Sequence, residues 1–360
     1  MLKANKKKIC IVVSSLGKGG AERSSGLLSQ MLYNSGYDVH VVSVLNDIEF
    51  PFKGELLNLG EFKDLNDTSY GRWQRLRILK AYLKTHNFDY IIDNRTRIGF
   101  VKEYLISQFI FNPKKTIYCI RSYKTSNYIN PNRFFGRLLY ANAYKIVGVS
   151  KAIAEHVKTV YKFKNVTSIY NPIIFEEHCT KSEKQKNYIL FFGRLDDEVK
   201  NISLLIEAYS KSELPKHHVN LKILGEGKDL EKLKNQVETL KLDSNVEFLG
   251  YNPNPSGYVK SALFTVLTSR YEGFPRSILE SLALGTPVIS VDCKSGPDEI
   301  INHEFNGMLV ENHNPETLAK AMTKLFVDKD LYLQCKQNSK ASVEQFSEAE
   351  IVKQWQSILN

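Results

Sequence analysis

The 360-residue sequence lacks any long apolar run, and this absence narrows the class of protein. No stretch of about 18 apolar residues occurs, so we expect no transmembrane helix. Near the N-terminus the apolar run is only ICIVV, which is too short for the core of a signal peptide and is typical of a buried first strand. Low-complexity tracts and repeats of fixed period are also absent, so the composition indicates a globular protein.

Cysteine is scarce, and its spacing carries no motif. The five cysteines (residues 10, 119, 179, 293 and 335) are scattered, and none forms a C-x-x-C pair. This pattern predicts a reducing compartment and argues against a structural zinc site. None of the eight histidines lies in a setting that predicts catalysis.

Acidic residues are scarce in the first half of the chain. Residues 1–170 hold 27 Lys and Arg against 12 Asp and Glu, whereas residues 171–360 hold 22 against 27. The first half therefore carries a net charge of +15 and the second half −5, which indicates that the first half faces something anionic: nucleic acid, a phosphorylated small molecule or an acidic membrane surface. Simple solubility is the alternative explanation.

Strands and helices alternate along the first half. The strand patterns KKKICIVVSS, DVHVVSVL, FDYIIDN, KKTIYCI and AYKIVGVS are separated by helical patterns such as RWQRLRILKAYLKTHN. The polar segment from about residue 46 to residue 70 is predicted to be a loop. Continuous apolar strands alternating with helices predict a parallel sheet covered on both faces.

The alternation breaks at SIYNPIIF, where the Asn-Pro pair disfavours helix and indicates a linker. A second alternating series then runs from NYILFFG to PETLAKAMTKLF. We therefore expect an α/β chain with two doubly wound, Rossmann-like domains, residues 1–170 and 171–345. Residues 346–360 are expected to form a helix that packs back toward the first domain. Ligands of such sheets bind at the carboxyl ends of the strands, so the cleft between the domains is the expected site.

Three short motifs follow predicted strands. In SSLGKGGAER, the glycines at 17, 19 and 20 open a helix and could present N–H groups to an anion. The stretch matches neither a dinucleotide fingerprint nor a P-loop, and a plain strand-to-helix turn is the alternative. In FFGRLDDEVKN, Arg194 and Lys200 suit a diphosphate, although both could be solvated loop charges. The adjacent acidic residues are read as a solvated turn, not a metal site.

The third motif, RYEGFPRSILES, holds two glutamates with seven residues between them. Pro275 fits the first turn of a helix, which places Glu272 in the preceding loop and Glu280 about one and a half turns inside. One stretch could thus offer a carboxylate to sugar hydroxyls, helix N–H groups to phosphate, and a second carboxylate to a ribose diol.

Together these motifs resemble the retaining glycosyltransferases of family 4, which have the GT-B fold. The resemblance covers nearly the whole chain and rests on GKGGAE, GRLDDEVKN, LKILGEGKDLEKL, VEFLGY, EGFPRSILE, ALGTPVIS and NGMLVENHNPETLAKAM. It implies transfer of a hexose or N-acetylhexosamine from a nucleotide-sugar with retained anomeric configuration, UDP being the default nucleotide and GDP the runner-up. It also implies that donor binding needs no divalent metal and no other cofactor.

The resemblance also implies roles for individual residues. Arg194 and Lys200 would hold the donor diphosphate and stabilise its charge, and Glu272 would bind the donor sugar; these three are the expected catalytic residues. Glu280 would bind the ribose diol. The further donor-binding positions are Gly17, Gly19, Gly20, Arg121, Gly193, Gly250, Tyr251, Gly273, Phe274, Pro275, Ser277 and Ile278. Arg121 stands where many members of the family carry histidine.

Two carboxylates also suggest a retaining glycosidase, in which they lie about 5 Å apart. The loop-and-helix placement separates Glu272 from Glu280, and the nearby cations favour a phosphate leaving group. A GT-B nucleotide-sugar epimerase and a non-catalytic nucleotide-sugar-binding protein remain alternatives.

The resemblance implies a glycan or lipid-linked acceptor, as in the assembly of cell-surface polysaccharide or lipopolysaccharide. The lysines at 3, 6, 7 and 8 and the segment RWQRLR around Trp73 are expected to rest on anionic headgroups. We therefore expect a cytoplasmic enzyme that is peripheral on the inner face of the cell membrane. No nucleic-acid-binding module occurs, so nucleic acid is not an expected partner.

Overall fold

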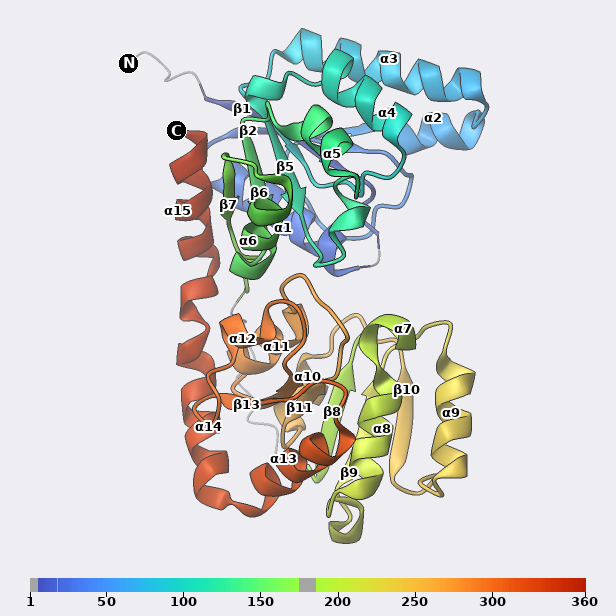
Figure 1. Cartoon of the computed structure of the whole chain (residues 1–360), viewed down its shortest axis with the longest axis vertical. Coiled ribbons are helices and arrows are strands. Elements are labelled where there is room, and N and C mark those ends of the chain that lie inside the picture. The colour runs from blue at the N-terminus through green and yellow to red at the C-terminus, as the bar shows by residue number, and fades with distance from the viewer. Residues whose placement is uncertain (1–5, 18, 175–185) are drawn as a thin grey trace. The chain divides into compact units, whose positions relative to one another are not determined.

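The computed structural model describes residues 6–17, 19–174 and 186–360, which form two compact units (Figure 1). Unit 1 comprises Met1–Pro172 together with Glu348–Asn360, and unit 2 comprises Ile173–Ser347. The chain therefore leaves unit 1 at the predicted Asn-Pro linker and returns to it for the last helix.

Unit 1 is built on a parallel seven-stranded sheet with the order β3-β2-β1-β4-β5-β6-β7. The strand order reverses direction between β1 and β4, and right-handed crossovers place helices on both faces of such a sheet. Its elements are β1 (Lys8–Val13), α1 (Gly20–Asn34), β2 (Asp38–Ser43), β3 (Glu55–Asn58), α2 (Leu59–Leu65), α3 (Ser69–His86), β4 (Tyr90–Asp93), α4 (Phe100–Leu105), the π-helix η1 (Ile106–Ile110), β5 (Thr116–Ile120), α5 (Arg133–Tyr140), β6 (Lys145–Gly148), α6 (Lys151–Tyr161), β7 (Val166–Ser168) and α15 (Glu348–Leu359).

The last helix, α15, contributes directly to the core of unit 1. Ile351, Trp355 and Leu359 recur at helical spacing and are buried against strands β1 and β2 and helix α1. Two hydrogen bonds anchor its end: the Lys7 ammonium donates to the Leu359 carbonyl at 2.9 Å, and the Tyr144 hydroxyl donates to the Ile358 carbonyl at 2.8 Å.

Unit 2 is built on a parallel six-stranded sheet with the order β10-β9-β8-β11-β12-β13. Its strand order reverses direction between β8 and β11. Its elements are β8 (Tyr188–Phe192), α7 (Asp197–Lys200), α8 (Ile202–Lys211), β9 (Asn220–Leu224), α9 (Leu230–Thr239), β10 (Val246–Gly250), α10 (Ser256–Ser261), β11 (Thr265–Leu267), α11 (Arg276–Ala283), β12 (Val288–Val291), α12 (Pro297–Ile300), β13 (Gly307–Val310), α13 (Pro315–Val327) and α14 (Lys329–Ser342).

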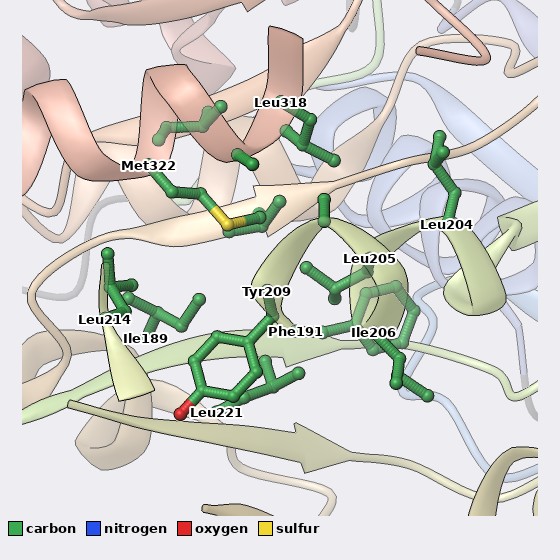
Figure 2. Close-up of a cluster of buried hydrophobic side chains, with 14 of the residues drawn as sticks. Ile189, Phe191, Leu204, Leu205, Ile206, Tyr209, Leu214, Leu221, Leu318 and Met322 are labelled. Carbon is green, nitrogen blue, oxygen red and sulfur yellow. The ribbon is translucent and has the colours of Figure 1, made fainter. Parts of the chain in front are cut away.

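The core of unit 2 fills the space between this sheet and helices α8 and α13. Figure 2 shows Ile189, Phe191 and Leu221 of the strands packed against α8 side chains and against Leu318 and Met322 of α13. Tyr209 is also fully buried, and its hydroxyl donates to the Val219 carbonyl at 2.6 Å, which satisfies the one polar atom of the side chain.

The structure corrects the prediction for residues 46–70. This segment was expected to be a loop, but it holds strand β3 and helix α2. Both are short: four and seven residues. Asn58 is the N-cap of helix α2, and its side chain accepts a hydrogen bond from the Gly60 N–H at 3.0 Å. The polar composition of the segment is typical of a loop, so the sequence analysis did not identify this helix start. Within the described residues, no helix combines the length and the apolar character that crossing a membrane would need.

Candidate functional site

In unit 2, the predicted donor-site residues follow the carboxyl ends of the strands where the strand order reverses. Gly193 comes directly after β8, and Glu272 lies in the loop between β11 and α11. Doubly wound sheets bind ligands at this position because the loops of the two strands diverge there. The amide of Gly193 donates to the Leu224 carbonyl at 3.0 Å, which ties this loop to the next strand.

Lys200 and Glu272, which were predicted to contact neighbouring parts of one donor, lie in direct contact. The Lys200 ammonium donates to Glu272 Oε1 at 2.6 Å, and the Ser269 hydroxyl donates to the same oxygen at 2.6 Å. Both charged side chains are mostly buried, so their attraction is stronger than that of an exposed pair.

The turn that carries Lys200 is fastened to the loop that carries Glu272 by further hydrogen bonds. The Thr268 hydroxyl donates to the Lys200 carbonyl at 3.0 Å, the Arg270 N–H to the Val199 carbonyl at 2.8 Å, and the Arg270 guanidinium to Asn201 Oδ1 at 2.7 Å. Lys200 and Glu272 are therefore held in a fixed geometry, which a site that stabilises developing charge requires.

Asp197, one of the acidic residues predicted to be solvated, is buried instead. It receives hydrogen bonds from the Ser203 hydroxyl and from the Lys232 ammonium, both at 2.7 Å. Burial raises the pKa of Asp197, but the hydrogen bonds from Lys232 and Ser203 outweigh it and hold the pKa below its ordinary value. Asp197 thus fixes the turn before Lys200, a role that its exposed-looking sequence context did not indicate.

Arg194 lies apart from the Lys200–Glu272 pair. Its side chain is 69% exposed, and its guanidinium lies 3.8 Å from the Asp196 carboxylate. The structure therefore presents Arg194 as an accessible cation on the same loop, free of the close contacts that hold Lys200.

Helix α11 places the second glutamate one turn inside the helix. Pro275 occupies the N-cap, so the helix begins at Arg276, one residue later than predicted. Arg276 and Glu280 pair across one turn at 3.0 Å, a contact that the sequence analysis did not identify although the spacing of four residues is the usual one. Among the described residues no side chain caps the helix, and an uncapped helix start is a usual place for an anion.

Two other predicted donor-binding residues of unit 2 have side chains that belong to the core, which leaves only their backbone groups for a ligand. Phe274 and Ile278 are buried, and the Phe274 ring contacts Phe346 at a centroid distance of 5.1 Å. The Gly273 carbonyl accepts a hydrogen bond from the Ser295 hydroxyl at 2.9 Å. Ser277 lies partly exposed in the first turn of α11.

Gly250 ends β10 with a φ of +70°, a conformation that favours glycine, and Tyr251 follows it with a half-exposed side chain. The Gly225 N–H donates to the Gly250 carbonyl at 2.8 Å. A Cβ atom on Gly225 would lie 1.9 Å from the Gly193 carbonyl oxygen. The backbones of the loops that follow β8, β9 and β10 are therefore in direct contact.

In unit 1, the predicted glycines follow β1 at its carboxyl end. Gly19 is the N-cap of α1, and Gly20 is its first residue; Gly17 precedes them. The Glu22 carboxylate folds back against this helix start, since a Cβ on Gly19 would lie 2.2 Å from Glu22 Oε2. An anion arriving at this end of α1 would have to displace that carboxylate.

Arg121 follows the carboxyl end of β5. Its guanidinium donates to Asn171 Oδ1 at 3.0 Å, while its Nε is buried and has no hydrogen-bond partner among the described residues. A buried donor that lacks a partner costs free energy, which an incoming acceptor can relieve.

A buried ionic network that the sequence analysis missed lies at the carboxyl end of β4. Asp93 pairs with Arg95 at 2.8 Å and with Arg97 at 3.8 Å, and Arg95 also contacts Glu103 at 3.2 Å. Burial would raise the pKa of Asp93, but the two guanidinium groups hold it below its ordinary value. The sequence signal for this network is DNRTR, in which an acidic residue and two arginines directly follow an apolar strand. Charged side chains next to a buried strand are buried only when they pair with opposite charges, and this motif contains both signs.

Two protein-family models match the chain side by side. The model described as Glycosyltransferase Family 4 matches residues 18–177, and the model described as Glycosyl transferases group 1 matches residues 175–342. The boundary between the two matches falls within five residues of the boundary between unit 1 and unit 2.

Full-length relatives and solved structures give the same result. The chain is 28% identical to the N-acetylgalactosamine-N,N'-diacetylbacillosaminyl-diphospho-undecaprenol 4-alpha-N-acetylgalactosaminyltransferase of Campylobacter jejuni, over 96% of this chain and 97% of that protein. Its fold matches TarM of S. aureus with a TM-score of 0.80 at 16% identity, over the whole of both chains. It matches Anabaena HepE in complex with UDP with a TM-score of 0.78 at 19% identity, over 98% of this chain and 99% of that one. The chain therefore belongs to glycosyltransferase family 4 and has the GT-B fold.

Proposed function

We propose that this protein is a retaining glycosyltransferase that moves a hexose or N-acetylhexosamine from a UDP-sugar to a glycan or lipid-linked acceptor in the assembly of cell-surface polysaccharide. The observation that carries the proposal is the contact between Lys200 and Glu272. It joins a cation suited to the donor diphosphate and a carboxylate suited to the sugar hydroxyls within one hydrogen bond, and so supports a donor whose sugar–phosphate bond lies beside both.

In the proposed reaction, the bond between the anomeric carbon and the diphosphate oxygen breaks while the acceptor oxygen bonds to that carbon on the same face. The acceptor proton passes to the departing diphosphate. Lys200 and Arg194 stabilise the negative charge that develops on the diphosphate, and Glu272 orients the sugar. Glu280 holds the ribose, and the uncapped start of α11 faces the phosphates between them. In unit 1, the Arg121 Nε–H, which has no hydrogen-bond partner among the described residues, donates a hydrogen bond to a substrate oxygen.

The choice of UDP is supported by the complexes of structural relatives. Anabaena HepE has been solved with UDP-glucose, and S. aureus TarM with UDP. Unit 2 offers two cations, Lys200 and Arg194, and the helix N–H groups of α11 to neutralise the charge of a diphosphate. We therefore propose that donor binding needs no divalent metal.

The choice of acceptor is supported by relatives that build cell-surface polymers. The name of the Campylobacter enzyme specifies an acceptor linked to undecaprenol diphosphate, and a Bacillus subtilis relative is a poly(glycerol-phosphate) alpha-glucosyltransferase. Acceptors of both kinds carry phosphate, which suits a basic first unit.

We further propose that unit 1 rests on an anionic membrane through a surface formed by α4, η1 and α5, termed the α4–α5 surface. Phe100 of α4 contacts Phe135 of α5 at a ring distance of 4.6 Å, and the Gln108 amide donates to the Leu138 carbonyl at 3.5 Å, so these elements lie side by side. Six large apolar side chains of these elements, and Ile98 just before α4, are between 39% and 71% exposed: Ile98, Val101, Leu105, Phe109, Phe134, Phe135 and Leu138. Single exposed apolar residues are common on protein surfaces, whereas a cluster of this size is typical of an interaction site.

The charge around the α4–α5 surface favours an anionic lipid surface as its occupant. Between Glu103 and Glu155 the sequence has eight Lys and Arg residues and no Asp or Glu. Of these, Arg133 and Arg137 lie on α5 itself and are exposed. Exposed aromatic side chains beside cations bind membrane interfaces through both apolar and electrostatic contacts.

Part of the basic surface expected from the sequence is engaged within unit 1. Arg75 of the segment RWQRLR pairs with Asp67 at 2.8 Å and is mostly buried, and the Lys7 ammonium is bound to a backbone carbonyl. Trp73 and Arg77 remain exposed and stack on each other at 4.7 Å. Lys3 lies outside the described residues. The membrane proposal therefore rests on the α4–α5 surface, with Trp73 as a further contact.

The test is a panel of UDP- and GDP-sugars incubated with the protein and a lipid-diphosphate acceptor, with Mg²⁺ and Mn²⁺ omitted, and followed by mass spectrometry and NMR. We expect transfer from a UDP-sugar to give an α-configured product. An inverted product, a strict need for Mg²⁺, or epimerisation of the donor without transfer would each contradict the proposal.

A further inference from the structure

Two histidines and a glutamate from separate parts of unit 1 converge beside strand β2. His40 lies on β2, Glu55 is the first residue of β3, and His86 is the last residue of α3. Their nitrogen and carboxylate ligand atoms all lie within 4.8 Å of one another. His40 Nδ1 lies 3.6 Å from Glu55 Oε2, close to the separation of about 3.3 Å that two ligand atoms have when they bind one tetrahedral zinc ion.

The environment of His40 is that of a metal ligand. His40 is only 3% exposed, and its Nε2 lies 3.5 Å from Asp38 Oδ1, so a carboxylate can hold the ring while Nδ1 faces Glu55. Metal-binding histidines commonly have such a carboxylate on the other ring nitrogen.

From this convergence we infer that unit 1 binds one Zn²⁺ ion through His40, Glu55 and His86. Two imidazoles and one carboxylate are a usual zinc donor set, and a water completes a tetrahedral site. In the structure as described, the Tyr82 hydroxyl contacts His40 Nδ1 at 2.6 Å and Glu55 Oε1 at 3.4 Å. Zinc binding would turn this hydroxyl away from Nδ1 and leave it beside the carboxylate.

The position of this site in the sheet indicates a structural role. Asp38 and Glu55 begin their strands, whereas the glycines and Arg121 follow the carboxyl ends of theirs. The zinc site therefore lies at the opposite edge of the sheet from the proposed substrate contacts, where it would fasten the end of α3 to β2 and β3. The sequence analysis argued against a structural zinc site from the lack of C-x-x-C pairs, but that absence excludes only cysteine ligands. No spacing motif links residues that are 15 and 46 positions from His40.

The experiment uses the full chain, stripped with a chelator and desalted, and titrated with zinc chloride by calorimetry without donor or acceptor. We expect one zinc per chain, with a Tm that rises by about 5–10 °C when free zinc is 100 times the Kd. Cobalt(II) chloride should give the intense visible bands of a tetrahedral N/O site. The His86→Gln and Glu55→Gln variants, both at partly or fully exposed positions, should keep their fold and lose these signals.

The matched control is His303→Gln, which removes an exposed histidine that lies beside a glutamate in unit 2. It should bind zinc as the unmodified protein does. Absence of saturable zinc binding up to 100 times the protein concentration, or equal binding by His86→Gln and the unmodified protein, would overturn the inference. Because neither measurement involves transfer, its failure is distinct from failure of the proposed glycosyltransferase activity.

Discussion

Lys200 and Glu272, 72 positions apart in the sequence, share a hydrogen bond of 2.6 Å at the carboxyl edge of the unit 2 sheet. If this lysine stabilises the departing diphosphate, Lys200→Ala should lower kcat by about 10²–10³-fold, the usual cost of losing one such group. Lys200→Arg should recover part of the rate because it keeps the charge. Steady-state kinetics with the best UDP-sugar would measure both.

The control for this prediction is Lys211→Ala, since Lys211 is also paired with glutamates, at 2.6 and 2.7 Å, but lies on the surface of α8. Its kcat should be unchanged. Equal loss in both variants would mean that Lys200 acts only through the stability of unit 2.

Removal of the second glutamate should separate binding from chemistry. Glu280→Ala is expected to raise KM for the nucleotide-sugar about tenfold, because it removes a charged hydrogen-bond acceptor from the ribose, and to change kcat by less than about threefold. Glu238→Ala, at an exposed position of α9, should leave both constants unchanged. If Glu280→Ala lowered kcat as strongly as Lys200→Ala, Glu280 would belong with the catalytic residues.

The close approach of Gly225 to the Gly193 carbonyl predicts a steric effect. Gly225→Ala should destabilise the protein by about 2–4 kcal/mol, because the methyl group would meet backbone 1.9 Å away at a φ of +152°. Gly285→Ala tests the φ effect alone, since φ there is +79° and nothing lies within 4 Å of the new atom; we expect a cost of about 1 kcal/mol. Urea unfolding would measure the difference, and equal costs would contradict the steric explanation.

The buried network around Asp93 predicts a dependence of stability on pH. Because the folded-state pKa of Asp93 is lowered, its contribution to stability is fully present above the unfolded value near about 3.9 and is lost as pH falls through the lower folded value. Asp93→Asn should cost about 3–5 kcal/mol at neutral pH, since it leaves two buried guanidiniums under-compensated.

Urea denaturation of Asp93→Asn at several pH values would show this as a stability difference that narrows below about pH 4. Exposed Asp243→Asn serves as the reference substitution and should change stability by less than about 0.5 kcal/mol at neutral pH. A constant difference for Asp93→Asn down to pH 2 would contradict the assignment.

The α4–α5 surface predicts a specific loss of membrane binding. The double variant Phe134→Glu, Phe109→Glu should no longer co-sediment with vesicles that contain anionic lipid. It replaces two exposed rings with negative charges, which the anionic headgroups repel. Leu333→Glu, at a half-exposed position of α14 in unit 2, should bind vesicles as the unmodified protein does. Absence of binding by the unmodified protein at low salt would end the membrane proposal.

Periodicity predicted most of the fold, because long buried strands and amphipathic helices carry a strong pattern. It failed for β3, α2 and β7, which have between three and seven residues, too few for a period to appear. It also did not identify helix α14, whose few buried positions are diluted by lysine and glutamine.

For the candidate site, sequence motifs named residues but not their contacts. Lys200 and Glu272 were assigned separately, and only the folded loops bring them together. Asp197 looked solvated because three acidic residues in a row usually are, and its burial depends on Lys232 from a different helix. Such long-range pairing leaves no local pattern in the sequence.

The return of the last helix to unit 1 has a consequence for synthesis on the ribosome. Unit 2 is one continuous segment, but unit 1 needs Ile351, Trp355 and Leu359 to complete its core. The first 172 residues therefore emerge with an uncovered apolar face until α15 has been synthesised, whereas unit 2 is complete before α15 is made. Loss of α15 alone would thus disable unit 1, although the other residues of that unit are made first.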